Sequence, residues 1–235
     1  MEPGDEAPLD DLDALIRRVD VDRWLSSRYV ADAERRSDLI ALYAYDHEIT
    51  RAPRVVSKPL LGEIRLAWWR EALDAIYAGQ AVRRHPVAEA LKTAVARRGL
   101  PREFLETPLD ARYDDLQPGA FEDEAALNAW LDAAYGSIMA AAARMLDPAA
   151  DPHAVKSAGR AWGLGRLPPE RPPLGFDAYA TIGRHLRVAR TEARMLSPAA
   201  FPAVAHLVLG NRVGRQQAGI GDRLRLTLAV LTGRV

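Results

Sequence analysis

The apolar residues of this chain recur at the 3.6-residue period of an α-helix along almost its whole length. Residues 37–51, 60–78 and 123–146 each carry an apolar stripe, and this period places the stripe on one helical face. No stretch shows the sustained alternation between turn dipeptides that is typical of β-strands. The sequence therefore predicts an all-α fold with these three segments among its central helices. The stripe of the second segment consists of Leu61, Ile64, Trp68, Ala72 and Ile76.

Local signals predict where several helices begin and end. Ser37 is a candidate N-cap, and Pro53 is expected to end the same helix because the residue before a proline is pushed out of the α region. Gly79 and Gly99 suit the left-handed residue that closes a helix. Pro108 is expected to interrupt the helix that contains it.

Some side chains receive structural interpretations. Trp68 and Trp69 are adjacent, so one is expected in the core and the other at a lid, an interface or a membrane contact. The five histidines never pair at metal-ligand spacing and are interpreted as surface or cap residues. Spacings of three and four residues predict two surface ion pairs, Arg112 with Asp115 and Arg70 with Asp74.

The domain organisation follows from length and charge distribution. A chain of 235 residues suits one large domain or two small ones. Residues 1–13 carry six acidic residues and no basic one, so we expect an acidic, mobile tail followed by one helical domain over 14–235. The clearest break, GLGRLPPERPPLG at 163–175, is too short for an interdomain linker.

Composition excludes several classes of protein. The formal net charge is zero, which gives no reason to expect nucleic-acid binding. No cysteine occurs, so disulfides and cysteine-ligated metals are excluded. From residue 160 to 235 there are twelve arginines against four acidic residues, which favours either a solvated basic face or a surface for phosphate, a membrane or an acidic partner. With no signal peptide and no apolar run of about 18 residues, we expect a cytoplasmic protein, soluble or peripheral to a membrane.

Six segments together resemble the squalene/phytoene synthase family, in its order and spacing, over roughly residues 24–167. The resemblance implies the all-α isoprenoid synthase fold, a single-domain helical bundle around a central cavity. These segments are RRSDLIALYAYDHEI, EIRLAWWREALDAIYAG, HPVAEAL, LDARYDDL, ALNAWLDAAYGSIMAAAARML and AGRAWGLGRL.

The metal-binding positions implied by this resemblance depart from the family pattern. Active members condense two prenyl diphosphates and hold Mg²⁺ with two aspartate-rich motifs. The places of the first motif hold Thr50, Arg51 and Arg54, and Arg166 replaces the usual asparagine of the second. Glu170 stands where the first aspartate of the second motif would be. Because arginines reverse the local charge, we predict no metal, no cofactor and no catalytic residue.

The degenerate pattern resembles a non-catalytic branch of the family, which includes a mitochondrial assembly factor of respiratory complex I. That likeness implies a helper of NADH dehydrogenase assembly, peripheral to the inner membrane. The implied partners are subunits or assembly intermediates of complex I.

Two other hypotheses stay open. The chain could bind an isoprenoid or an anionic lipid without turnover, through Thr50, Arg51, Arg54 and Arg166 converging on one electropositive cavity. It could instead be a prenyl-diphosphate transferase with unorthodox metal binding, the one case that requires Mg²⁺. Internal ion pairing of Arg51, with Glu48 or Asp115, is the structural alternative to ligand binding.

Overall fold

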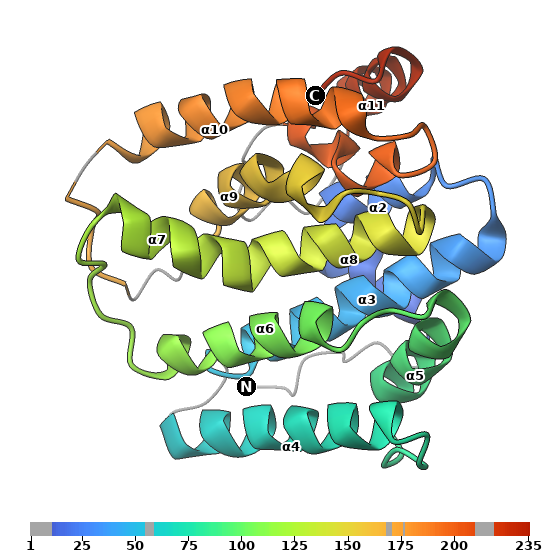
Figure 1. Ribbon diagram of the computed structural model, residues 1–235, viewed down its shortest axis with the longest axis vertical. Coiled ribbons are helices and arrows are strands. Elements are labelled where there is room, and N and C mark those ends of the chain that lie inside the picture. Colours follow the sequence, from blue (N-terminus) through green and yellow to red (C-terminus); the bar gives the residue numbers. More distant parts are fainter. Residues whose placement is uncertain (1–10, 55–58, 168–170, 176, 210–218) are drawn as a thin grey trace.

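The computed structural model describes residues 11–54, 59–167, 171–175, 177–209 and 219–235, and every regular element within these ranges is helical. The all-α prediction is confirmed (Figure 1). The longer elements are α1 (Leu12–Val19), α2 (Val21–Ser27), α3 (Ala33–Arg51), α4 (Pro59–Tyr77), α5 (Pro86–Arg98), α6 (Glu103–Ala111), α7 (Glu124–Leu131), α8 (Ser137–Leu146), α9 (Lys156–Leu164), α10 (Ala178–Glu192) and α11 (Ile220–Thr232). The short turns are η1 (Tyr113–Leu116), η2 (Asp132–Gly136), η3 (Pro152–Val155), η4 (Ala193–Met195), η5 (Phe201–Ala203) and η6 (Ala205–Leu209).

A rod made of α7, the π-helical turn η2 and α8 runs through the middle of the molecule. In Figure 1, α3 and α6 lie on one side of this rod, and α9 and α10 lie on the other. The rod matches the segment 123–146, whose central position is thereby confirmed, and Ala140, Ala141, Ala142 and Ala143 are all buried. The predicted helix over 37–51 is the greater part of α3 and is also central.

Helix α4 lies at the edge of the molecule, so its predicted central position is wrong (Figure 1). Its buried face includes Leu66, Trp69 and Leu73. Of the predicted stripe, Ala72 and Ile76 are buried, whereas Leu61 and Ile64 are 46% and 56% exposed. The first turns of α4 have the apolar spacing of a core helix, but no described element covers them. Within the described residues, no helix is long and apolar enough to cross a membrane.

Most predicted helix ends are correct. The left-handed residues Gly79 and Gly99, with φ of 70° and 59°, follow α4 and α5, and α3 ends shortly before Pro53. The start of α3 was placed too late, because Asp32 accepts hydrogen bonds from the amides of residues 34 and 35 and caps the helix before Ser37. The expected interruption at Pro108 is wrong, because α6 continues through it to Ala111 and loses only the hydrogen bond that an N–H at position 108 would donate to the carbonyl of Phe104.

The beginning of the domain includes part of the predicted acidic tail. Asp11 caps α1 by accepting a hydrogen bond from the amide of Ala14. Asp13 in the first turn of α1 forms an ion pair with Arg28. Residues 1–10 of the tail lie outside the described residues.

Glycines let α9 approach the central rod at backbone contact. A Cβ atom added to Gly159 would lie 2.7 Å from the Cα of Gly136 in η2. One added to Gly163 would lie 2.5 Å from the ring of Tyr135 and 2.6 Å from the side chain of Leu131. These distances are too short for non-bonded carbon atoms, so the α9–η2 contact depends on both glycines.

We predict that Gly159→Ala lowers the free energy of unfolding by about 1–3 kcal/mol, because backbone must move to admit the methyl group. Gly119→Ala is the matched control, since a Cβ there meets nothing within 4 Å. Urea denaturation followed by circular dichroism measures both. Equal stability of the two variants would contradict the packing described for α9.

Candidate functional site

An unbroken series of alternating acidic and basic side chains crosses the interior of the bundle. We call it the buried ion-pair chain. Its members, in spatial order, are Asp20, Arg23, Asp46, Arg112, Asp115 and Arg171.

The first half of the chain joins α2 to α3. Arg23 in α2 donates from Nε to Oδ2 of Asp20, the N-cap of the same helix, at 2.5 Å. Its Nη1 lies 2.8 Å from Oδ2 of Asp46 in α3, and its guanidinium carbon is 4.6 Å from the ring centroid of Tyr43. The three charged side chains are at most 12% exposed. Water therefore contributes little to their stabilisation.

The second half joins α3 to α6 and to the segment after α9. Nη2 of Arg112, at the end of α6, lies 3.6 Å from Oδ1 of Asp46, and its Nη1 lies 3.3 Å from Oδ2 of Asp115 in η1. Nη2 of Arg171 lies 2.9 Å from the other oxygen of Asp115. The predicted pairing of Arg112 with Asp115 is thus confirmed, but its surface location is wrong, since both side chains are fully buried.

Aromatic rings from η2 and α7 seal this half of the chain. The guanidinium carbon of Arg112 lies 4.7 Å from the ring centroid of Tyr135 and 5.8 Å from that of Trp130. Arg112 also donates to the carbonyl oxygen of Ala134 at 3.2 Å. The other predicted pair does not form, because Arg70 reaches Glu106 and Asp110 on α6 while Asp74 pairs with Arg102.

Asp20 and Arg23 stabilise each other's ionised forms. Burial alone would raise the pKa of Asp20, but Arg23 and Arg166 more than offset it, and the pKa lies below its ordinary value. Burial lowers the pKa of Arg23, while Asp20 and Asp46 act in the opposite direction and leave it raised. Three carboxylates and three guanidiniums balance, so the chain as a whole is neutral.

Arg166 lies beside the Asp20 end of this chain. Its guanidinium carbon is 3.1 Å from the ring centroid of Trp162, and burial, the largest effect, lowers its pKa while Asp20 acts to raise it. The ring of Trp162 also contacts that of His206, with the centroids 4.3 Å apart. His206 is fully buried and not a surface or cap residue as predicted, and burial lowers its pKa to about 3.

The other predicted site residues stand at the end of α3. Thr50 donates to Oδ1 of Asp46 at 3.4 Å, and Arg51 forms an ion pair with Glu48 at 3.2 Å. The predicted internal pairing of Arg51 with Glu48 is confirmed, whereas Asp115 is occupied by the buried chain. Arg54 is exposed on the turn that follows. Thr50 and Arg51 are neighbours, while Arg166 has a different set of contacts. The convergence of Thr50, Arg51, Arg54 and Arg166 on one cavity stays a prediction.

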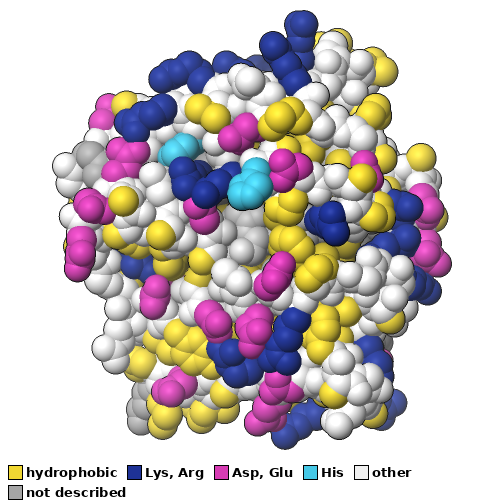
Figure 2. Space-filling view, viewed as in Figure 1, with side chains coloured by type: hydrophobic (Ala, Val, Ile, Leu, Met, Phe, Trp, Pro, Cys, Tyr) yellow, Lys and Arg dark blue, Asp and Glu magenta, His cyan; other side chains and the backbone are white. Residues whose placement is uncertain are grey.

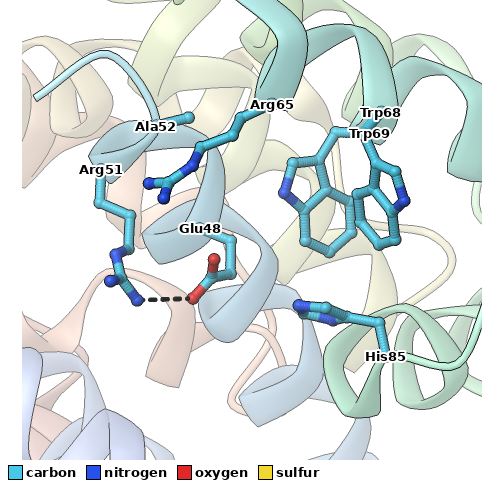
Figure 3. Close-up of a pocket in the computed structure, with 7 residues that line it drawn as sticks. All are labelled: Glu48, Arg51, Ala52, Arg65, Trp68, Trp69 and His85. Carbon is cyan, nitrogen blue, oxygen red and sulfur yellow. Dashed lines mark hydrogen bonds and ion pairs between the residues drawn. The ribbon is translucent and has the colours of Figure 1, made fainter. Parts of the chain in front are cut away.

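Arg51 also lines a half-open cavity of about 220 Å³ between α3, α4 and α5, which we call the tryptophan pocket (Figure 3). Trp69 is buried, and Trp68 is partly exposed with its ring edge-on to Trp69 at 4.9 Å. In Figure 3 the two indoles face the guanidinium groups of Arg51 and Arg65 across the cavity. The remaining lining residues are Glu48, Ala52 and His85.

The side chains at the first-motif positions do not suit the Mg²⁺ ions that the family resemblance implies. Asp46, one turn before the first-motif positions, already accepts from Arg23 and Arg112. Thr50 and Arg51 supply no carboxylate there. No group of three His, Asp or Glu side chains able to hold a metal ion occurs among the residues that the structure describes. Glu170 lies outside those residues.

Comparison with known proteins identifies the family of this chain. Residues 16–167 match the family model for squalene/phytoene synthase. The chain belongs to the squalene/phytoene synthase family. It superposes on a dehydrosqualene synthase crystallised in complex with a ligand (TM-score 0.72, 12% identity) and on squalene synthase HpnC from Alicyclobacillus acidocaldarius (TM-score 0.66, 14% identity). Each alignment covers 94% of both chains, which shows the isoprenoid synthase fold.

Curated relatives belong to a different functional class. NADH dehydrogenase (ubiquinone) complex I, assembly factor 6, from Bos taurus and from Homo sapiens, is 29% identical to this chain over 153 residues. The match covers 64% of this chain and 45% of each relative, so it spans less than half of their length. The chain is thus a member of a synthase family with sequence similarity to assembly factors.

We predict that Arg112→Leu lowers the free energy of unfolding by about 3–5 kcal/mol, because Asp46 and Asp115 lose a buried counter-ion. Arg70→Leu, which removes a half-exposed arginine with two acidic partners, is the matched control and should cost about 1 kcal/mol or less. Chemical denaturation of both variants at neutral pH tests this. Similar losses in the two would show that the buried chain is no more important than a surface pair.

Proposed function

We propose that this chain is a non-catalytic member of the squalene/phytoene synthase family that acts as an assembly or helper factor for respiratory complex I. The observation that carries the proposal is the buried ion-pair chain. It binds the interior carboxylate Asp46 to Arg23 and Arg112, beside a motif position where Thr50 and Arg51 replace acidic residues.

Prenyl transfer requires carboxylates that are free to hold divalent cations against a diphosphate. Here Asp46 and Asp115 each have two arginine partners, so a cation would have to displace a buried guanidinium. Breaking one buried pair costs about 3–5 kcal/mol before any metal is bound. The pairing of these carboxylates with arginines therefore supports a function other than prenyl transfer.

Similarity to complex I assembly factor 6 supports the choice of partner. The partners in this proposal are subunits or assembly intermediates of complex I. The proposed location is the cytoplasm, peripheral to the inner membrane.

We predict that deleting the gene in its host reduces fully assembled complex I, measured as in-gel NADH dehydrogenase activity after native electrophoresis. The wild-type gene should restore it, and so should Arg84→Ala, which changes an exposed position outside the buried chain and the candidate site. The amounts of other respiratory complexes are the internal control. Normal complex I in the deletion strain would contradict the assembly role.

The purified protein should release no inorganic diphosphate from farnesyl or geranylgeranyl diphosphate in the presence of Mg²⁺, because its interior acids are engaged by arginines. An active dehydrosqualene synthase in the same assay provides the positive control. Diphosphate release that a chelator abolishes would overturn the non-catalytic assignment and favour the transferase.

The tryptophan pocket favours a second candidate, binding of an isoprenoid phosphate or anionic lipid without turnover. Arg51 and Arg65 offer guanidiniums to a phosphate, and Trp68 and Trp69 offer apolar surface to the attached chain. Farnesyl diphosphate that raises the melting temperature without being cleaved would support this candidate. Loss of that rise in Arg65→Ala would assign the binding to the pocket.

A further inference from the structure

Helix α11 carries a stripe of aliphatic side chains exposed to solvent. Ile220, Leu224, Leu228 and Leu231 are 80%, 60%, 61% and 77% exposed. Isolated exposed leucines are ordinary, but four of them at successive turns of one helix form a continuous apolar surface. We call this surface the α11 stripe.

The stripe points away from the protein. At 100° per residue its four side chains fall within an arc of about 80°, and the buried residues Asp222, Leu226 and Ala229 lie roughly 150° from its centre. The inner face is packed against the bundle through the buried Leu226 and Ala229, and on the Arg223 side of the helix Tyr29, in the turn after α2, and Thr227 share a hydrogen bond of 2.6 Å between their hydroxyl groups. The helix is therefore fixed to the bundle with its apolar stripe outward.

Arginines border the stripe on both sides. Arg223 and Arg225 are exposed and lie about 100° from the centre of the stripe in opposite directions. This order, aliphatic in the middle and arginine at each border, matches a helix lying in a membrane interface. The long arginine side chains can reach headgroup phosphates while the leucines enter the acyl region.

The neighbouring surface is also basic. Arg190 on α10 donates to the terminal carbonyl oxygen of Val235 at 2.9 Å, which brings α10 to the end of α11. Lys and Arg side chains gather along this edge of the molecule in Figure 2. Among the described residues from 178 onward, the acids are Asp222, which is buried and caps α11, and Glu192, which binds Ser157. The exposed arginines there are Arg184, Arg187, Arg190, Arg194, Arg223, Arg225 and Arg234.

We infer that the α11 stripe docks the protein on an anionic lipid bilayer. Charge complementarity selects this occupant over a second copy of the chain, because two α11 faces would bring Arg223 and Arg225 of each copy together. Docking of this kind needs no membrane-spanning helix. This inference rests on the peripheral location in the proposed function and assigns that location to a specific surface. The two can fail separately, because complex I assembly could require the protein even if it does not bind vesicles.

Flotation of the purified protein with vesicles tests the inference. We expect binding to phosphatidylcholine vesicles that contain phosphatidylglycerol, weak binding to pure phosphatidylcholine, and loss of binding at high salt. Leu224→Asp with Leu228→Asp should lower the partition coefficient by on the order of tenfold or more, because carboxylates replace the groups that enter the acyl region. Arg223→Gln with Arg225→Gln should lower it by about fivefold for each arginine and weaken its salt dependence.

Leu61→Asp with Ile64→Asp on α4 is the matched control, since it places the same charges on another exposed aliphatic patch. It should leave binding unchanged, and circular dichroism establishes that each variant is folded. Absence of binding to anionic vesicles, or equal losses in the α4 and α11 variants, would overturn the inference. A wild-type dimer in light scattering that the α11 leucine variant converts to monomer would instead assign the stripe to a second copy.

Discussion

The buried ion-pair chain ties together α2, α3, the end of α6 and η1 in the interior of this protein. A charge removed from water is costly unless a counter-ion and hydrogen bonds replace the solvent. Arg23 meets this requirement with Asp20 and Asp46, which links α2 to α3, and Arg112 meets it with Asp46 and Asp115, which links α3 to α6 and η1. Because each inner member has two partners, a shift of one helix would leave more than one charge uncompensated. A displacement of α2, α3 or α6 therefore costs buried ion pairs in addition to apolar contacts.

The same chain supports the proposal that this member of the family keeps the synthase fold without holding divalent cations. In an active synthase, divalent cations offset the charge of interior carboxylates. Here guanidiniums attached to the protein offset the charge of Asp46 and Asp115 and need no ligand to do so. At the first-motif positions, Thr50 and Arg51 likewise need no cation to offset a charge. Arg51 forms an ion pair with Glu48. Within the described residues, each member of the buried ion-pair chain has a partner of opposite charge, which supports the proposed non-catalytic role over the binding of a diphosphate with several metal ions.

The sequence predicted what depends on local interactions and missed what depends on distant ones. The helix ends at Gly79 and Gly99 were predictable because left-handed backbone favours glycine wherever it occurs. The pairing of Arg112 with Asp115 was predictable from its spacing, but its burial was not, because Trp130 and Tyr135 cover it from another part of the chain. The burial of Asp46 could have been predicted, because a charged residue within an otherwise apolar helix indicates a buried ion pair. Its partners Arg23 and Arg112 lie in other helices, and no local spacing identifies them.

The two exposed aliphatic patches show why apolar spacing alone does not indicate burial or function. Leu61 and Ile64 on α4 have the spacing of a core stripe, yet they are exposed, and their exposed neighbours Glu63 and Arg65 carry opposite charges. The α11 stripe has comparable exposure, but both of its borders carry arginine. Apolar area sets how strongly either patch avoids water, whereas the sign of the bordering charge sets which surface can cover it. Of these two patches, the α11 stripe is the one that combines an aliphatic centre with borders of one sign, a combination that an anionic bilayer can match along the helix.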